Sequence, residues 1–470
     1  MAAFHLTIGG KPVKSAKFTD VINPADESIV APCPVATADD LDAAVAAARK
    51  AFGPWSALSP EARAAQLMKV ADLLEQHQAE LAKLVTLEQG KTQSGPGAMF
   101  EAGGAVAWTR VTAGLNLADE VIHQDPTGRI VLRRKPLGVV GSITPWNWPL
   151  MIAVWHVMPA LKVGCTVVIK PSPFTPLSTL KMVELMNTVL PPGVINVVTG
   201  DADIGTRMAK HPGINKMVFT GSLATGKKVM GGAIDTLKRV TLELGGNDAG
   251  VVLPGTDVTP MLEGLFWGCF INAGQTCAAL KRLFVHEKQY DAVVEQLSAY
   301  VAKIPVGNGM DPTNLIGPVS TRPQFAKVVN YVDDARARGA RIVTGGLKPK
   351  GPGFFYPLTV IADVTDDMPV VKEEQFGPLI PVISYSTVEE AIARANSLDY
   401  GLGGSVWGND PAEATRYADR LECGTVWVNK HGMLHPLAPF GGTKCSGVGT
   451  EFNLDGLREY TSVNVLHGPA

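Results

Sequence analysis

The sequence predicts an α/β fold with two parallel-sheet domains and a smaller β element. Three patterns carry this prediction: short apolar strands alternate with helices over residues 137–243, a second alternating series begins near residue 249, and a hairpin pattern occupies residues 120–138. Apolar strands separated by helices are typical of βαβ units, whose parallel sheet is covered by helices on both faces. We therefore expect two Rossmann-like sheets in one chain.

The first series is preceded by strand and turn patterns up to about Pro34, and then by helices. A helix is expected to begin at Ser59-Pro60-Glu61, because a capping hydroxyl, a first-turn proline and an early acidic residue favour a helix start. One apolar face at helical spacing follows, formed by Leu67, Val70, Ala71, Leu74, Leu81, Leu84 and Val85. The series itself has strands at Val139–Ile143, Thr166–Ile169, Val194–Val198, Met217–Thr220 and Val240–Leu242, with helices at Pro149–Lys162, Pro176–Leu190, Asp203–Lys210 and Ala224–Ala233.

The second series repeats the alternation in the other half of the chain. Its strands are expected near Ala249–Leu253, Arg282–Val285, Arg341–Thr344, Gly403–Val406 and Thr425–Val428, and its helices at 290–304, 324–338, 387–396 and 411–421.

The β element is predicted from two segments. Residues 120–138 form a hairpin around Asp125-Pro126-Thr127-Gly128, and the β-prone stretch Tyr460–Leu466 has no obvious partner strand within its own domain. Such a hairpin can pair with the sheet edge of another subunit, or it can be a simple surface hairpin.

Composition excludes several classes of protein. Hydrophobic residues make up 46% and charged residues 18%, which is ordinary for a soluble enzyme, and Lys+Arg 42 against Asp+Glu 44 leaves no basic stripe for nucleic acid. No Cys or His pair has zinc-ligand spacing, so no metal is expected. The N-terminal MAAFHLTIGGKPV has charge and glycine where a signal peptide needs an apolar stretch. Six scattered cysteines (Cys33, Cys165, Cys269, Cys277, Cys423 and Cys445) are expected to be thiols in a reducing cytoplasm.

Residues 137–155 are uncharged and about as long as a membrane span. Pro145, Asn147 and Pro149 interrupt this stretch at its centre. We therefore expect a buried strand, a tight turn and a buried helix, and no membrane association.

Three residues are candidates for chemistry. Cys277 lies in GQTC among small, uncharged neighbours that leave a thiol accessible, which is unusual for core filler. Glu243 ends an apolar strand, where a carboxyl tends to have a raised pKa that suits a general base; it can equally be a glutamate bound by the following glycine amides. Asn147, between two prolines, offers an amide donor for an oxyanion or is a structural turn residue.

Two further motifs are typical of ligand contacts, although each is weak alone. VFTGSLATGKKV follows a strand and opens a helix, so Gly221 and Gly226 would let the backbone approach a phosphate at the helix start; a plain strand–helix turn explains it equally well. Lys170 ends another strand, where parallel sheets present ligands, or is a solvated strand end.

The motifs PWNWP, VIKPS, FTGS, LELGG and GQTC occur in this order, and Cys277 follows Glu243 by 34 residues. With KEEQFGP at 372–378 and PFGGTKCSG at 439–447, this set resembles the NAD(P)-dependent, non-acylating aldehyde dehydrogenase superfamily over almost the whole chain. The resemblance implies a cofactor-binding domain at 1–117 and 137–245 and a catalytic domain at 246–438. Residues 118–136 and 439–470 would form an oligomerisation element that joins subunits into a homodimer or homotetramer.

The resemblance also implies roles for single residues. Cys277 would attack the aldehyde, Asn147 and the Cys277 amide would hold the oxyanion, and Glu243 would activate water to hydrolyse the thioester. Lys170 would contact the adenosine ribose, Ser222 the pyrophosphate, and Glu374 the nicotinamide ribose. The cofactor would be NAD, with NADP possible, and its expected contacts are Ile143, Thr144, Pro145, Trp146, Lys170, Ser172, Pro173, Gly200, Gly221, Ser222, Gly226, Leu244, Glu374 and Phe376. The other five cysteines are expected to be inert.

Three departures from the family pattern concern specificity and proton transfer. Pro173 stands where many NAD-preferring members have a glutamate that repels a 2′-phosphate. His156 replaces a lysine that, with a late glutamate (here Glu451), is linked with proton relay, and an imidazole can substitute near neutral pH. The loop 430–440 is particular to this chain and is expected to bring His431 and His435 near the mouth of the substrate tunnel.

The substrate is expected to be a medium-chain or aromatic aldehyde, because the positions that match the tunnel are mostly apolar and none is an arginine that could bind a carboxylate. These positions are Ile152, Trp155, Trp267, Ile271, Thr276, Leu434 and Phe440. A cysteine hydrolase is disfavoured because no histidine is near Cys277 in the sequence. A catalytically silent relative is disfavoured by the intact Cys277, Glu243 and Asn147, and a CoA-acylating enzyme by Glu243.

Overall fold

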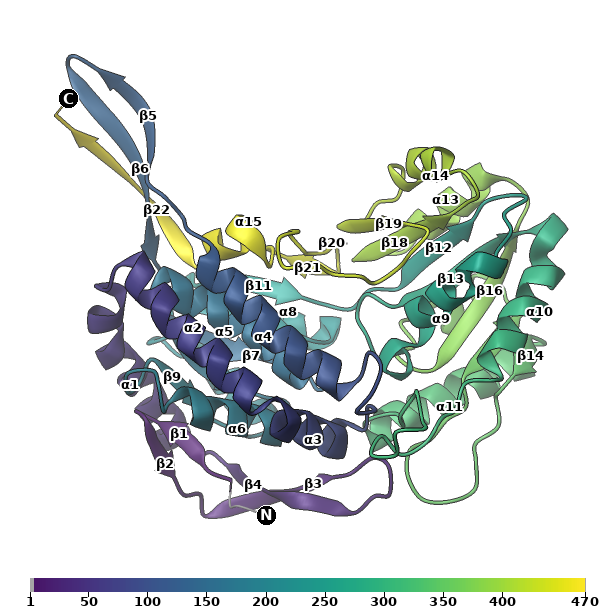
Figure 1. The fold of residues 1–470 in the computed structure, drawn as a ribbon, viewed down its shortest axis with the longest axis horizontal. Helices are drawn as coiled ribbons and strands as arrows, with labels where there is room; N and C mark the ends of the chain where they lie inside the picture. Colours follow the sequence, from purple (N-terminus) through teal and green to yellow (C-terminus); the bar gives the residue numbers. More distant parts are fainter. Residues whose placement is uncertain (1–3, 470) are drawn as a thin grey trace.

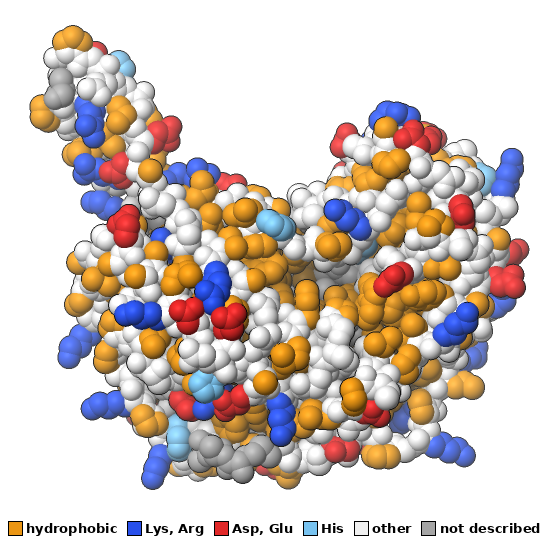
Figure 2. All heavy atoms as spheres, in the orientation of Figure 1, with side chains coloured by type: hydrophobic (Ala, Val, Ile, Leu, Met, Phe, Trp, Pro, Cys, Tyr) orange, Lys and Arg blue, Asp and Glu red, His pale blue; other side chains and the backbone are white. Residues whose placement is uncertain are grey.

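A computed structural model describes residues 4–469 of the chain (Figure 1). Two large mixed sheets lie side by side, one built mainly from the first half of the chain and the other from the second half (Figure 1). A narrow three-stranded arm projects from the first of them, and Figure 2 shows hydrophobic side chains gathered on this face between the two sheet domains. The predicted α/β fold with two sheet domains and a small β element is confirmed.

The first sheet has eight strands in the order β2-β1-β9-β8-β7-β10-β11-β21. Its five central strands are parallel, and all five were expected from the apolar pattern. The strands are β1 (Leu6–Ile8), β2 (Lys11–Val13), β7 (Val139–Ile143), β8 (Thr166–Lys170), β9 (Ile195–Val197), β10 (Lys216–Thr220), β11 (Arg239–Glu243) and β21 (Gly447–Val448). Parallel strands present their carboxyl ends at one edge, so Lys170, Ile143, Thr220 and Glu243 end there in neighbouring positions.

Helices cover this sheet, and α2 begins where the capping pattern predicts. Ser59 caps α2 by accepting from the amide of Ala62, and Pro60 occupies the first turn. The single apolar face expected from 67 to 85 belongs to two helices, which meet at His77. Both helices pack on one hydrophobic core. The helical spacing of apolar residues therefore continues from one helix to the next, and it does not indicate where the first helix ends. The helices are α1 (Ala38–Ser56), α2 (Pro60–Gln76), α3 (Gln78–Gln89), α4 (Ala98–Gly114), α5 (Pro149–Val163), α6 (Leu177–Met186), α7 (Ala202–Lys210) and α8 (Leu223–Ala233).

The second sheet has seven strands in the order β14-β15-β16-β13-β12-β18-β19. Sequence reasoning missed β15 and β16, although β16 lies next to β13 in the middle of the sheet. Pro381 argues against a central strand because it cannot donate a ladder hydrogen bond, but burial of the apolar residues around it decides the outcome. The strands are β12 (Asp248–Val252), β13 (Leu280–His286), β14 (Arg341–Thr344), β15 (Thr359–Ala362), β16 (Leu379–Tyr385), β18 (Gly403–Trp407) and β19 (Thr425–Val428).

The helices of this half include two that were not predicted, the short α12 and α9, which leads into the nucleophile loop. They are α9 (Leu262–Phe270), α10 (Tyr290–Val301), α11 (Arg322–Ala337), α12 (Pro369–Lys372), α13 (Val388–Asn396) and α14 (Pro411–Ala418). Two small antiparallel sheets of two strands each complete the fold outside the arm. They are β3 (Lys17–Ile22) with β4 (Ile29–Val35), and β17 (Tyr400–Gly401) with β20 (Thr443–Lys444).

The arm consists of β5 (Glu120–Asp125), β6 (Gly128–Pro136) and β22 (Thr461–Gly468), with α15 (Asn453–Arg458) at its base (Figure 1). The predicted hairpin is therefore confirmed. The C-terminal stretch, for which the sequence shows no obvious partner strand, pairs as β22 with β6 along its whole length. The partner strand lies more than 300 residues earlier, so no local pattern indicates it.

The uncharged stretch 137–155 forms β7, a turn and the start of α5, as expected. Across residues 4–469, no helix is both long enough and apolar enough to cross a membrane.

Candidate active site

A cleft with about 630 Å³ of empty space opens at the carboxyl ends of β10 and β11, facing the second sheet domain. Ten residues predicted from the sequence line it: Pro145, Trp146, Asn147, Gly221, Ser222, Glu243, Leu244, Cys277, Glu374 and Phe376. Sequence reasoning missed four further lining residues, Thr220, Gly245, Gln324 and Lys327. Gln324 and Lys327 lie on α11, which carries no recognised motif, so only the fold brings them here.

The loop before Cys277 has an unusual backbone. Asn272, Ala273 and Gly274 all have positive φ, at 53°, 56° and 69°, a conformation that ordinary side chains avoid. A β-carbon at Gly274 would lie 2.1 Å from the carbonyl oxygen of Gly377, so glycine is required there. The loop is held in place by the buried Gln275, whose Nε2 donates to the Asn272 carbonyl (2.9 Å) and whose Oε1 accepts from the Ser320 amide (2.8 Å).

Hydrogen bonds hold both the side chain and the backbone carbonyl of Asn147. Its Nδ2 donates to the Gln275 carbonyl (2.9 Å), which leaves the second hydrogen of this amide for another acceptor. Its carbonyl oxygen accepts from Lys91 Nζ and Asn272 Nδ2, each at 2.8 Å. Lys91 is buried and paired with Glu101, whose other oxygen accepts from the first amides of α5. Neither residue belongs to a motif that sequence reasoning singled out.

The surroundings of Glu243 and Cys277 disfavour the charged form of both groups. Glu243 is buried and neither carboxyl oxygen has a hydrogen-bond partner among the described residues. Burial raises the pKa of Glu243 well above its ordinary value, and the nearby Glu451 and Glu459 add to this effect. Burial likewise raises the pKa of the Cys277 thiol to about 12, against the lowering effect of Lys281. Burial therefore favours the neutral carboxyl of Glu243 and the neutral thiol of Cys277.

His156 is fully buried and lies between the cleft residue Thr220 and the carboxyl of Glu451. Its Nδ1 is 2.9 Å from Ser142 Oγ, and its Nε2 is 2.9 Å from Thr220 Oγ1 and 3.3 Å from a Glu451 oxygen. Thr220 lines the cleft and is the last residue of β10, where it lies beside Glu243, the last residue of the neighbouring β11. Thr220 is thus hydrogen-bonded to His156, and the buried Glu451 carboxyl lies next to this ring without a hydrogen bond of its own among the described residues.

Seven expected cofactor contacts are not among the residues that line this cleft: Ile143, Thr144, Lys170, Ser172, Pro173, Gly200 and Gly226. The Thr144 amide donates to the Lys170 carbonyl (3.1 Å), which joins the ends of β7 and β8. Lys170 is buried, and burial lowers its pKa to about 8, whereas Pro173 is exposed. Gly226 faces the Leu244 side chain, and a β-carbon at this position would lie only 2.5 Å from it, which is too close. The absence of a side chain therefore allows α8 to pack on β11.

An aromatic cluster adjoins the thiol on the side of α5. It includes five of the seven expected tunnel residues, Ile152, Trp155, Ile271, Leu434 and Phe440, with Cys277 packed against it. Thr276 joins through its hydroxyl, which accepts from Trp148 Nε1 (3.0 Å). Trp267 instead packs on the core around α9, so the structure does not bring it into the cluster. Sequence reasoning missed Trp108, Trp148, Trp427 and Phe452.

The two histidines of loop 430–440 have different surroundings. His431, expected near a tunnel mouth, is buried: its Nδ1 is 2.9 Å from Ser405 Oγ, and its ring lies 4.8 Å from that of Trp427. His435 is exposed. Three of the cysteines expected to be inert, Cys33, Cys165 and Cys269, are buried, and burial raises the pKa of each thiol.

Comparison with known proteins agrees with this geometry. The model of the aldehyde dehydrogenase family matches residues 12–466. The chain belongs to the aldehyde dehydrogenase family. As a member of this family it is an oxidoreductase that oxidises aldehydes with NAD(P)+ as the acceptor.

Relatives and solved structures of aldehyde dehydrogenases match nearly the whole chain. A phenylacetaldehyde dehydrogenase of Pseudomonas fluorescens is 38% identical over 478 residues, which cover 98% of this chain and 95% of the relative. Aldehyde dehydrogenase LUC3 of a Fusarium species is 37% identical over 466 residues, covering 99% of this chain and 98% of the relative. A betaine aldehyde dehydrogenase structure from Staphylococcus aureus, in complex with NAD+, has a TM-score of 0.96 at 35% identity and covers 99% of this chain and 95% of that one.

Proposed function

We propose that this aldehyde dehydrogenase oxidises medium-chain aliphatic or aromatic aldehydes to the free acids, through a thioester on Cys277 that Glu243 hydrolyses with water. The observation that carries the proposal is that Cys277, Glu243 and Asn147, from three distant segments, line one cleft beside an aromatic cluster. An acyl-transfer site needs a nucleophile, a base and an oxyanion donor around one reacting carbon, and these three residues supply them.

The residues of the cleft fit a dinucleotide. Helix α8 begins at the cleft with Ser222 as its N-cap, so its free amides can receive a phosphate. The rings of Trp146 and Phe376 lie 5.3 Å apart in the cleft wall, and the Glu374 carboxylate lies beside them. When bound, the nicotinamide supplies the acceptor for the hydride that leaves the aldehyde carbon. Glu374 would hold its ribose and Lys170 the adenosine ribose.

The chemistry of the chain's own residues follows from their positions. Cys277 adds to the aldehyde carbon as a thiolate, and the carbonyl oxygen becomes an oxyanion that the free Asn147 N–H and the Cys277 amide stabilise. After loss of the hydride the carbon is a thioester. Glu243 then takes a proton from water, which attacks the thioester and releases the acid with the Cys277 thiolate.

Proton transfer out of the cleft is the proposed role of His156. Its two nitrogens connect Ser142, Thr220 and Glu451, so a proton taken up at Glu243 could pass towards Glu451 through this set. A lysine at the same place would donate only, whereas an imidazole both donates and accepts.

NAD is the proposed cofactor, with NADP also accepted. The exposed Pro173 offers no carboxylate to repel a 2′-phosphate, and the residues next to Lys170 include no second cation to attract one. The Staphylococcus aureus relative was solved with NAD+.

The substrate class is proposed from the aromatic cluster, whose members are apolar and mostly buried. A panel of phenylacetaldehyde, decanal, betaine aldehyde and succinic semialdehyde, each with NAD and with NADP, tests it by following the reduced nicotinamide. The first two should have the highest kcat/KM. Preference for the charged aldehydes would refute the substrate class, and no turnover of any aldehyde would refute the reaction.

We also propose that the arm joins subunits into a homodimer or homotetramer. Its outer strands β5 and β22 are sheet edges, and apolar side chains on them are exposed: Val121, Ile122, Val463, Val465 and Leu466. Figure 2 shows the arm as a projection with hydrophobic side chains on its surface. A monomer in light scattering at working concentration would refute this proposal of a homodimer or homotetramer.

The proposed compartment is a reducing cytoplasm, because Cys277 must remain a thiol.

A further inference from the structure

Lys281 is the second residue of β13, four positions after Cys277, and its side chain is buried. Its ammonium donates to the carbonyl oxygens of Cys277 and Gly246, each at 2.6 Å, and to a carboxylate oxygen of Glu374 at 3.0 Å. An ammonium has three N–H donors, so all of its hydrogen-bonding capacity is used.

The three acceptors come from separate segments that all take part in the site. The Cys277 carbonyl belongs to the turn that presents the nucleophile, and Gly246 follows the end of β11, which carries Glu243. Glu374 comes from the segment after α12, 93 residues away from Lys281. One side chain therefore joins the nucleophile, the strand of the base and the proposed ribose contact.

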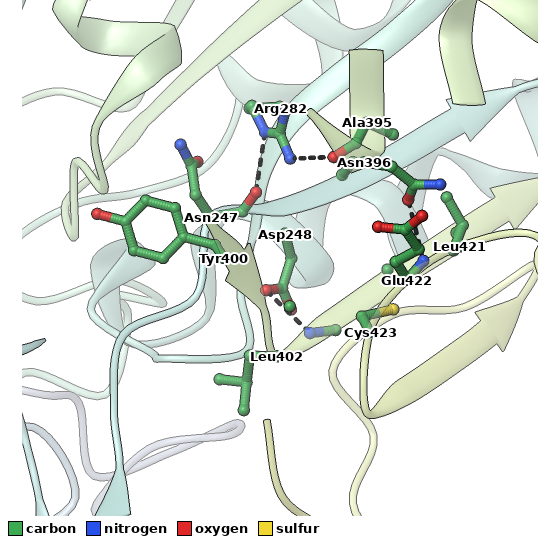
Figure 3. A pocket seen from close by; sticks show the side chains of 14 residues that line it. Asn247, Asp248, Arg282, Ala395, Asn396, Tyr400, Leu402, Leu421, Glu422 and Cys423 are labelled. Carbon is green, nitrogen blue, oxygen red and sulfur yellow. Dashed lines mark hydrogen bonds between the residues drawn. The ribbon is translucent and has the colours of Figure 1, made fainter. Parts of the chain in front are cut away.

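The neighbouring cation Arg282 points to the opposite side of the strand, as the period of two requires. Figure 3 shows it in a separate pocket, where it donates to the backbone oxygens of Asn247 and Ala395, each at 2.9 Å. Arg282 thus fixes the strand ends from one side, and Lys281 fixes the reacting groups from the other.

We propose that Lys281 is a positioning residue for the reaction: it holds the Cys277 turn and the Glu374 carboxylate in their working arrangement, and its charge keeps the thiol reactive. This inference rests on the proposed function for the roles of Cys277 and Glu374.

Two observations support the two parts of the proposal. The Glu374 carboxylate lies directly over Gly245, where a β-carbon would be 2.1 Å from its oxygen, and the Gly246 amide donates to it (3.3 Å). Lys281 supplies the only charged partner that Glu374 has among the described residues. Without the ammonium this carboxylate could turn away, which would weaken cofactor binding.

The electrostatic part depends on the charges that face the thiol. Burial raises the pKa of Cys277 and Lys281 lowers it. The carboxylates of Glu374 and Asp248 raise it further, and Glu243 does so when it is ionised. Loss of Lys281 would leave Glu374 as an unpaired negative charge near the sulfur. The thiolate, which is the reactive form, would then be rarer at every pH below the thiol pKa.

The test measures the thiol without any aldehyde. Alkylation of Cys277 by iodoacetamide is followed by peptide mass spectrometry as a function of pH, and NAD binding is followed by calorimetry. Lys281→Met should alkylate at least about tenfold more slowly at neutral pH, with the pH profile moved to higher pH, since each pKa unit changes the thiolate fraction tenfold. Its NAD affinity should fall. Lys281→Arg should restore part of both properties, and Lys288→Met, at an exposed lysine beyond the same strand, should match the wild type.

Glu374→Gln separates the two parts. It removes the negative charge while the ammonium stays, so alkylation should accelerate although NAD binding weakens. Equal alkylation profiles for Lys281→Met and the wild type would overturn the inference, and so would slower alkylation in Glu374→Gln. If Lys281→Met does not fold, the Arg and Gln variants decide. A wild type that neither alkylates at Cys277 nor binds NAD would instead refute the proposed function.

Discussion

Substitution of Glu243 by glutamine tests the protonation state of the buried carboxyl. Both of its oxygens lie in the cleft without a hydrogen-bond partner among residues 4–469, and burial holds the pKa well above the ordinary 4.5. The folded protein therefore keeps a proton that the unfolded chain releases above pH 4.5. Glutamine has the same shape and is neutral at every pH.

The magnitude follows from proton linkage. Because the folded-state pKa exceeds the unfolded value, the stability linked to this proton is complete below the unfolded pKa and is lost as the pH rises through the folded pKa. Each pH unit in which only the folded state binds the proton lowers the free energy of unfolding by about 1.4 kcal/mol. The Glu243→Gln variant escapes this loss, so its free energy of unfolding should gain on the wild type by up to about 1.4 kcal/mol per pH unit.

Urea unfolding from about pH 5 upwards, followed by tryptophan fluorescence, measures this difference, provided that the slope against urea is the same in both proteins. Glu295→Gln, at an exposed position on α10, is the matched control and should not diverge from the wild type. A difference between wild type and Glu243→Gln that stays constant over this range would refute the reasoning, because the carboxyl would then not be held protonated by its burial.

The same substitution separates the two halves of the reaction. A resting base that is protonated must ionise before it can take a proton from water, so wild-type turnover should rise with pH over the same range. Glu243→Gln should give a burst of reduced cofactor of about one per site, followed by very slow turnover, because deacylation lacks its base. Loss of the burst would show that Glu243 acts before hydride transfer.

The remaining predictions concern the nucleophile, the oxyanion and the cofactor. Cys277→Ala should abolish aldehyde oxidation and leave NAD binding intact by calorimetry; appreciable turnover would contradict the covalent mechanism. Asn147→Ala should lower kcat by about 10²–10³ with a small change in aldehyde KM, and a change confined to KM would assign Asn147 to substrate binding instead. Pro173→Glu should shift the ratio of kcat/KM for NAD over NADP towards NAD by about tenfold to a hundredfold, since a close like-charge contact is worth on the order of 1–3 kcal/mol. An unchanged ratio would mean that other residues set the preference.

Local patterns in the sequence were sufficient for much of the architecture. The five central strands of the first sheet are short apolar runs between polar turns, and Ser59-Pro60 marks a helix start, because both signals depend only on neighbouring residues. The ordered motifs likewise identified the family and ten residues of the cleft. Chemistry that is carried by one residue in a short motif can be found without the fold.

Contacts between segments that are distant in the sequence could be identified only from the tertiary structure. Asn147 and Gln275 are 128 positions apart, and Lys281 and Glu374 are 93 apart, so no local spacing predicts that they hydrogen-bond. Burial also decided features that local patterns did not indicate: β16 forms around Pro381, and His431 is buried. The sequence by itself determined the central strands of the first sheet, the hairpin of the arm and the side chains that can react. Only the packing of the two sheet domains against each other decided which groups surround these side chains. Those surroundings set the direction in which the pKa of each reactive group is shifted.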